Sequence, residues 1–363
     1  MEAMPGWVTG AFGFLIGAAA GFFVRRARLC TFGAFEDAIA GQDARRLKVF
    51  GLAIGVAMLA TQALVLFAGL DLAHVRYLPS QVPWLAIAVG GVLFGLGMAL
   101  VGTCAFGSLI RLGSGDLRSV LTLLIFSATA YAMLRGALSP LRVDYAEAIT
   151  LPMPGETRSD LASLAGAALG LDIRLALAAL CAGALVLIFF GDPRLRRSRR
   201  HTEAGLVLGL GVAGGWLVTG VLADEFSLVA SADSLTFVAP VARSVFGFML
   251  TSGQVPDFGT GSVFGVVAGA FLAAWQAGEL RWEAFDDHHE MKRHMVGAAL
   301  MGMGGVLAGG CTIGQGLTAG SMLALSWPIA VIGMAVGARI GIALLIEGSL
   351  RGLLARLGLF PAR

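Results

Sequence analysis

The chain has 363 residues, of which 57% are hydrophobic and 13% are charged, and its formal net charge is +3 at pH 7. Because a soluble domain carries about a quarter charged residues, this composition, with a mean hydropathy of +0.82, excludes an ordinary soluble protein. It predicts an all-α integral membrane protein in a lipid bilayer, and the small net charge gives no indication of a nucleic-acid partner.

Apolar runs long enough to cross about 30 Å of hydrocarbon recur along the whole chain. In chain order they lie near residues 7–24, 49–70, 84–103, 119–137, 161–190, 204–222, 237–253, 260–278, 295–310 and 326–346. We therefore expect roughly nine or ten apolar helices, some of them only half-spanning. The first run lacks a basic flank, so we interpret it as a retained helix and not as a signal peptide.

Loop charge predicts the orientation of these helices. The strongest basic cluster, at residues 194–200, is expected to be cytoplasmic because basic loops stay on that side of the membrane. The loops at 139–160 and 224–233 are rich in acidic residues and are expected to be external. Arginines in the last stretch, 351–363, place the C-terminus in the cytoplasm.

Three of the four cysteines begin the same pattern, Cys-x-x-Gly, and each pattern interrupts an apolar run. The patterns run from Cys30 to Gly33, from Cys104 to Gly107 and from Cys311 to Gly314. A fourth break, Pro256-Asp257-Phe258-Gly259, has the same spacing without a cysteine. At this glycine content, three such hits arise by chance in roughly one chain in a hundred. Since no Cys-x-x-Cys pair is present, the cysteines predict neither a disulfide framework nor a metal site.

The chain also matches itself at a shift of 207 residues. The shift places six residues on six of the same type: Gly90 on Gly297, Gly95 on Gly302, Gly97 on Gly304, Gly102 on Gly309, Cys104 on Cys311 and Gly107 on Gly314. A weaker match relates Gly13, Gly17 and Gly21 to Gly261, Gly265 and Gly269, both of them stripes of small residues typical of helix packing.

The loop charges indicate that the two matching copies run in opposite directions. This predicts an inverted repeat whose broken, re-entrant half-helices meet at the midplane, where such repeats hold their substrate. We expect a first membrane repeat at 1–137 and a second, inverted one at 203–363. Residues 138–202 would form an external loop, a connecting membrane helix and the basic cytoplasmic loop.

Within hydrocarbon, an irregular backbone is tolerated only where it lines a cavity or is buried in protein. We expect the glycines Gly33, Gly107 and Gly314 to adopt positive φ, so that a second short helix begins at each break. The free N–H groups of such helix ends suit an anion. The alternative is that these glycines, with Gly259 at the fourth break, only permit tight packing.

The cysteines admit three interpretations: buried filler, thiolate nucleophile or neutral thiol donor. Cys181 lies within an unbroken apolar run and is interpreted as filler. For Cys30, Cys104 and Cys311, burial in the membrane and an arriving anion both favour the neutral thiol. Weak S–H donors suit conduction, because a conducted ion must leave each site as well as enter it.

Three further polar residues are secondary candidates for contact with a substrate. Asp257 lies beside the fourth break, with a loop cap as the alternative role. Gln315 follows the third pattern and is interpreted equally as a turn amide. Arg243 would attract an anion if it were intramembrane, or else extend to the external interface. No residue pattern predicts a cofactor.

These breaks resemble those of the YeeE/YedE family of sulfur-compound transporters. The resemblance rests on the segments 28–34, 102–108, 257–263 and 309–316 and spans roughly residues 10 to 345. It implies an hourglass-like protein with helix-loop-helix units that dip from each face, and thiosulfate that passes the three thiols without lasting covalent capture. It also implies delivery to a small cytoplasmic sulfur-carrier protein of the TusA type. The loop at 139–160 departs from the family pattern.

The residues and the resemblance together predict a transporter and not an enzyme: a multi-pass importer of thiosulfate or a related sulfur anion in a bacterial inner membrane. Three alternatives stay open: a membrane sulfurtransferase that forms a cysteine persulfide, a transporter of another sulfur or selenium species, and a scaffold subunit. No lysine or histidine adjoins the cysteine patterns, which argues against the sulfurtransferase, although Arg25, Arg26 and Arg28 lie near Cys30.

Overall fold

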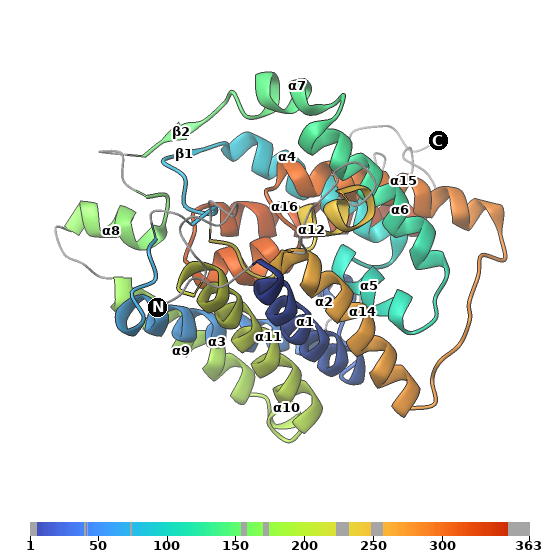
Figure 1. Cartoon of the computed structure of the whole chain (residues 1–363), viewed down its shortest axis with the longest axis horizontal. Helices are drawn as coiled ribbons and strands as arrows, with labels where there is room; N and C mark the ends of the chain where they lie inside the picture. Colours follow the sequence, from blue (N-terminus) through green and yellow to red (C-terminus); the bar gives the residue numbers. More distant parts are fainter. Residues whose placement is uncertain are drawn as a thin grey trace.

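The computed structural model describes residues 6–39, 41, 43–72, 75–153, 158–169, 174–222, 232–247 and 257–347. Pro256, most of the acidic loop at 224–233 and the C-terminal stretch 351–363 therefore lie outside the described residues. The described part is all-α, as predicted, apart from one two-stranded antiparallel sheet in which β1 (Gln81–Val82) pairs with β2 (Leu151–Pro152) (Figure 1).

The helices of the described part differ widely in length. The longer ones are α1 (Gly6–Arg26), α3 (Arg45–Phe67), α4 (Trp84–Val101), α6 (Arg118–Arg135), α9 (Arg174–Phe190), α11 (Arg199–Gly220), α14 (Phe258–Gln276), α15 (His288–Leu307) and α16 (Ser326–Glu347). The shorter ones are α2 (Thr31–Ile39), α5 (Ala105–Gly113), α7 (Ser139–Leu141), η1 (Arg142–Ala146), α8 (Leu161–Leu169), α10 (Pro193–Arg196), α12 (Ala239–Ala242), η3 (Arg243–Gly247) and η4 (Gly314–Ala319).

Several helices are long and apolar enough to cross a membrane. The described residues contain six such segments, and a seventh if α6 and the α7–η1 segment, bent by 65° against each other, form one span. Two predicted runs are not single helices. The run at 161–190 contains the separate helices α8 and α9, and the run at 237–253 begins with the short α12 and η3.

The contacts between helices of the first half of the chain and helices of the second half have counterparts in which the roles of the two halves are exchanged. Helix α1 packs on α14 while α3 packs on α11, and α4 packs on α16 while α6 packs on α15. The short elements follow the same rule, since α5 contacts α14 and η4 contacts α3. Helices α4 and α15 pack on each other. Two related halves, α1 to α6 and α11 to α16, would produce this pattern of contacts.

The glycine stripes of α1 and α14 form the contact surface between these two helices. A Cβ on Gly13, Gly17 or Gly21 would lie 2.1–2.3 Å from a backbone oxygen of α14. On the other side, a Cβ on Gly265 would lie 2.1 Å from the backbone oxygen of Phe14. The two stripes are therefore helix-packing surfaces, as predicted, and they pack on each other.

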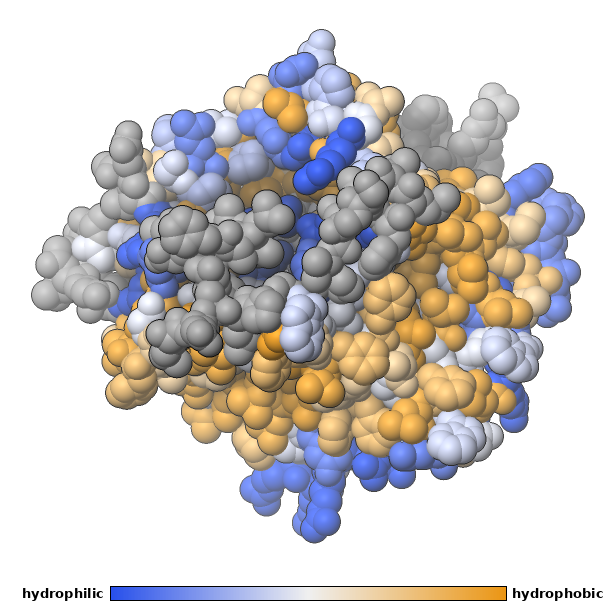
Figure 2. Space-filling view, in the orientation of Figure 1, coloured by the Kyte–Doolittle hydropathy of each residue, from blue (hydrophilic) through white to orange (hydrophobic). Residues whose placement is uncertain are grey.

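Residues 139–153 lie over one end of the molecule (Figure 1). They carry α7 and strand β2, at the top of Figure 1, and α10 lies at the opposite end. The end of the 139–160 segment is fixed to the loop before α16, because the Leu325 amide donates to the Ser159 oxygen (2.8 Å) and the Leu161 amide to the Leu323 oxygen (2.9 Å). Figure 2 shows a broad hydrophobic band between the hydrophilic side chains around α7 and those around α10.

Candidate functional site

Each of the three cysteines stands at the start of a short helical segment. The backbone oxygens of Cys30, Cys104 and Cys311 each accept a hydrogen bond from the amide four residues later, at 2.8–2.9 Å. The Sγ atoms of Cys104 and Cys311 also accept the amide N–H of Gly107 and Gly314, both at 3.4 Å. A helix-capping side chain makes this bond to the third residue on. At Cys104 and Cys311 the Cys-x-x-Gly spacing is therefore that of a helix cap in which a thiol replaces the usual hydroxyl.

The predicted positive φ at Gly33, Gly107 and Gly314 is wrong, because no glycine of the three patterns is among the described residues with positive φ. Positive φ occurs instead two residues before each cysteine, at Arg28 (52°), Gly102 (75°) and Gly309 (74°). A left-handed residue at this place ends the preceding helix. The chain therefore turns at the end of the first helix of each pair, and the cysteine then begins the second.

The glycines of the patterns make room for neighbouring side chains. An added Cβ would collide with a side-chain atom at each of them: Thr103 Oγ1 at 2.1 Å for Gly107, Thr236 Oγ1 at 2.5 Å for Gly314 and Arg46 Nη1 at 2.8 Å for Gly33. Close packing therefore accounts for these glycines, and it brings a hydroxyl group against two of the three breaks.

The side chains of the three cysteine patterns meet in one cluster. The Thr31 hydroxyl lies 3.5 Å from the Cys104 Sγ and accepts a hydrogen bond of 3.3 Å from the Thr312 hydroxyl. The Cys30 Sγ lies 3.7 Å from the Thr103 hydroxyl. We call these five side chains the thiol–hydroxyl cluster. Sequence reasoning missed its threonines, although each directly precedes or follows a cysteine in the chain.

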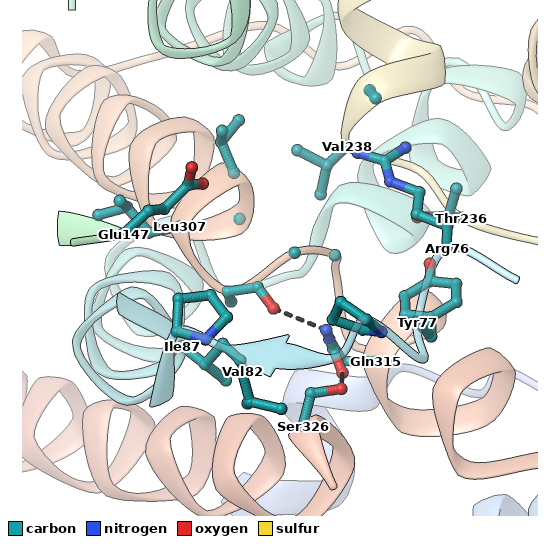
Figure 3. A pocket seen from close by; sticks show the side chains of 18 of the residues that line it. Arg76, Tyr77, Val82, Ile87, Glu147, Thr236, Val238, Leu307, Gln315 and Ser326 are labelled. Atoms are coloured by element: carbon teal, nitrogen blue, oxygen red, sulfur yellow. Dashed lines mark hydrogen bonds between the residues drawn. The ribbon is translucent and has the colours of Figure 1, made fainter. Parts of the chain in front are cut away.

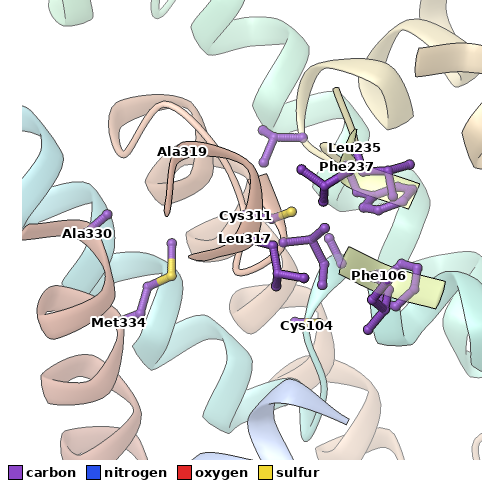
Figure 4. Close-up of a cluster of buried hydrophobic side chains, with 14 of the residues drawn as sticks. Cys104, Phe106, Leu235, Phe237, Cys311, Leu317, Ala319, Ala330 and Met334 are labelled. Carbon is purple, nitrogen blue, oxygen red and sulfur yellow. The ribbon is translucent and has the colours of Figure 1, made fainter. Parts of the chain in front are cut away.

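The four cysteines differ in how deeply they are buried and in what surrounds them. Cys104 and Cys311 have no exposed surface, whereas Cys30 is only partly buried. Figure 4 shows Cys104 and Cys311 among apolar side chains, including Phe106 and Phe237, whose ring centroids are 4.8 Å apart. Cys181 lies in a separate apolar cluster on α9, away from the three patterns.

The fourth break is capped by a carboxylate. Asp257 accepts a hydrogen bond of 2.7 Å from the Thr260 amide at the start of α14. Its other oxygen pairs with Arg243 Nη2 at 2.8 Å, so the half-buried guanidinium is held at the break. A Cβ on Gly259 would lie 2.7 Å from the Pro240 ring. Asp257 thus has the capping role that was its alternative interpretation, and Arg243 has a fixed acidic partner.

A cavity of about 190 Å³ lies beside the third cysteine pattern (Figure 3). It reaches from Arg76, Arg142 and Glu147 at the end covered by the 139–160 segment to Thr236 and Gly310, which directly precedes Cys311. We call it the outer cavity. The two arginines are paired, Arg76 with Asp233 (3.7 Å) and Arg142 with Glu147 (2.7 Å).

Gln315 forms part of the wall of the outer cavity. Its Nε2 donates to the Ala308 oxygen (2.7 Å), and its Oε1 accepts from the Ser326 hydroxyl (3.2 Å), as Figure 3 shows. Because α15 ends at this oxygen, the amide satisfies a carbonyl that the helix itself leaves free. Gln315 thereby fixes the break next to Cys311.

One group of side chains could hold a metal ion. Among the described residues, the possible ligand atoms of Asp287, His288 and His289 lie within 4.8 Å of one another, and all three side chains are exposed. Asp287 Oδ1 already caps α15 by accepting the His289 amide N–H at 3.1 Å. This group lies at the start of α15, apart from the cysteine patterns.

The contact between Gly107 and Thr103 gives a test of the cluster. We expect Gly107→Ala to lower transport about tenfold or more, because the new methyl group would push the Thr103 hydroxyl away from the Cys30 thiol. Uptake assays on the single variant and on the double variant with Thr103→Ala would check this. Removing the hydroxyl relieves the collision, so the double variant should be no worse than Thr103→Ala alone. Additive losses would contradict the collision.

Comparison with known proteins agrees with this geometry. The family model described as sulphur transport matches residues 26–340. Two curated relatives, both named thiosulfate transporter TsuA, are 27% identical to this chain. The one from Escherichia coli (strain K12) aligns over 90% of this chain and 91% of its own length, and the one from Spirochaeta thermophila over 90% and 96%. The family match takes in all four breaks and the outer cavity, and this protein therefore belongs to the sulphur transport family of multi-pass membrane transporters.

Proposed function

We propose that this protein imports thiosulfate, or a closely related sulfur anion, along its three neutral thiols. The observation that carries the proposal is the thiol–hydroxyl cluster, in which segments far apart in the sequence bring Cys30 against Thr103, and Thr31 against both Cys104 and Thr312. The names of the two relatives support thiosulfate as the anion.

The contacts give an order for the path. An anion would enter the outer cavity, drawn by Arg76 and Arg142, and meet Cys311 first. The hydroxyls of Thr312 and Thr31 would then lead to Cys104, and the partly buried Cys30 would come last. The proposed path would thus lead from the outer cavity past Cys311 and Cys104 to Cys30.

The thiols are suited to pass an anion because of how they are held. The Sγ atoms of Cys104 and Cys311 already accept an amide N–H, so each S–H hydrogen is available to a passing anion. A neutral thiol is a weak donor and does not repel the anion. The anion is therefore bound at each step and is free to move on.

The proposal includes an orientation and a partner. The end with the 139–160 segment would be external, and the basic end with residues 194–200 would face the cytoplasm of a bacterial inner membrane, together with the C-terminus. The two halves, 1–137 and 203–363, would then have opposite orientations. A dianion entering against an inside-negative potential faces about 4–5 kcal/mol per 100 mV. Rapid transfer to a small sulfur-carrier protein of the TusA type would offset that cost.

The test is uptake of radiolabelled thiosulfate into proteoliposomes, with label on the outer sulfur in one run and on the inner sulfur in another. We expect both labels to accumulate equally, because the intact anion crosses. Accumulation of the outer-sulfur label alone would mean that the S–S bond is cleaved on the way, and the protein would then be a sulfurtransferase. Uptake of neither label would overturn both functions.

A further inference from the structure

A second cavity, of about 360 Å³, lies at the end of α1 and the start of α11. We call it the inner cavity. Its charged lining consists of four arginines and one acidic residue: Arg25, Arg26, Arg28, Arg200 and Glu279. The uncharged residues Phe22, Ala273, Gln276 and Ala277 complete the wall. Helix α10, which leads into α11, is at the bottom of Figure 1, far from the 139–160 segment that covers the outer cavity.

Glu279 bridges two of these arginines. Its Oε2 lies 3.0 Å from Arg25 Nη2, and its Oε1 lies 2.5 Å from Arg28 Nη2. The hydrogen bond from Arg28 and the charge of both arginines hold the pKa of the Glu279 carboxyl below its ordinary value. The bridge is therefore charged at neutral pH. In the described part of the chain, Arg26 and Arg200 make no ion pair, so the cavity has more positive than negative charge.

The inner cavity is tied to two of the cysteine patterns. Arg28 precedes Cys30 by two residues and is the residue with positive φ (52°) that ends the turn after α1. Arg25 Nε donates to the Ser114 hydroxyl at 2.7 Å, and Ser114 directly follows α5, the short helix that Cys104 begins. A change in the position of either arginine would therefore displace a helix that begins at one of the cysteines.

We propose that the inner cavity is a binding site for a divalent oxyanion that leaves the thiol path, and that Glu279 is its built-in competitor. A carboxylate held by two guanidinium groups occupies the place that two oxygens of an oxyanion would take. An arriving dianion would displace Glu279, and the returning Glu279 would then release the anion. This inference rests on the proposed function for the direction of travel.

Binding is tested separately from transport. Sulfate, which cannot exchange sulfur with a thiol, would be titrated into the Cys311→Ala variant at fixed ionic strength by calorimetry, since salt screens such a site. Adding Glu279→Gln is expected to tighten sulfate binding about tenfold, because the competitor is lost, and adding Arg28→Gln to weaken it by a similar factor. The control is Glu283→Gln, a few residues further on, which pairs with Arg118 and should leave the affinity unchanged.

The outcomes separate this site from the proposed function. Sulfate binding that responds to Glu279→Gln supports the site even if no thiosulfate is taken up by proteoliposomes. An affinity that changes with neither Glu279→Gln nor Arg28→Gln overturns it. A lipid headgroup offers the same phosphate oxygens, so the titration is repeated in nanodiscs of neutral and of anionic phospholipid. Loss of sulfate binding in the anionic discs alone would overturn the release role and assign the cavity to lipid.

Discussion

Replacing Cys311 with alanine is expected to lower the initial rate of thiosulfate uptake about a hundredfold. Two losses combine in this variant. The passing anion loses an S–H donor, and the Gly314 amide, which donates to the Sγ atom at 3.4 Å, is left unpaired in a fully buried place. Each loss is worth about 1–3 kcal/mol. We expect the same result for Cys104→Ala, because the Gly107 amide donates to Cys104 in the same way.

Uptake of labelled thiosulfate by proteoliposomes would measure these losses. The control is Cys181→Ala, since this cysteine lies in a separate apolar cluster and should leave uptake near wild type. Cys311→Ser separates the two losses. Its hydroxyl accepts the Gly314 amide and so restores the helix cap, but it does not restore the soft S–H donor to the passing anion. If Cys181→Ala abolished uptake and Cys104→Ala left it unchanged, the proposed relay of thiols would be wrong.

The sequence predicted the breaks in the helices better than it predicted how each break is built. The spacing of Cys104 and Gly107 was sufficient to place a short helix after the cysteine, and α5 begins there. The same spacing could not show that Gly102, and not Gly107, has positive φ. In an unaligned sequence, a glycine that ends one helix looks the same as a glycine inside the next helix. Only the backbone conformation and its hydrogen bonds distinguish the two.

The threonines of the cluster show a second limit. Thr31 and Thr312 are separated by 281 positions along the chain, yet their hydroxyls are 3.3 Å apart. No periodicity or composition links two such residues, because their contact follows from the packing of helices that are far apart in the sequence. The outer cavity is hidden for the same reason, as Arg76, Thr236 and Gln315 come from three distant segments.

The glycine stripes between α1 and α14 are the site of a second substitution with a large expected effect. Gly265→Ala is expected to destabilise the folded protein by about 3 kcal/mol or more. The added Cβ would lie 2.1 Å from the Phe14 backbone oxygen. A flexible side chain could move away from it, but a backbone oxygen moves only if the α1 helix shifts as a whole. The two helices would then separate along the stripe, and the loss of packing would extend over their whole contact.

The midpoint of thermal unfolding in detergent, followed by size-exclusion chromatography of the heated samples, would measure this effect. The matched control is Gly183→Ala in α9, where an added Cβ would meet no atom within 4 Å. Alanine favours a helix over glycine by about 1 kcal/mol, so the control should be as stable as wild type or more so. Equal midpoints for the two variants would mean that α1 and α14 tolerate separation, and that close approach of their backbones does not hold the two halves together. A lower midpoint for Gly265→Ala alone would show that it does, because the two substitutions differ only in what the methyl group meets.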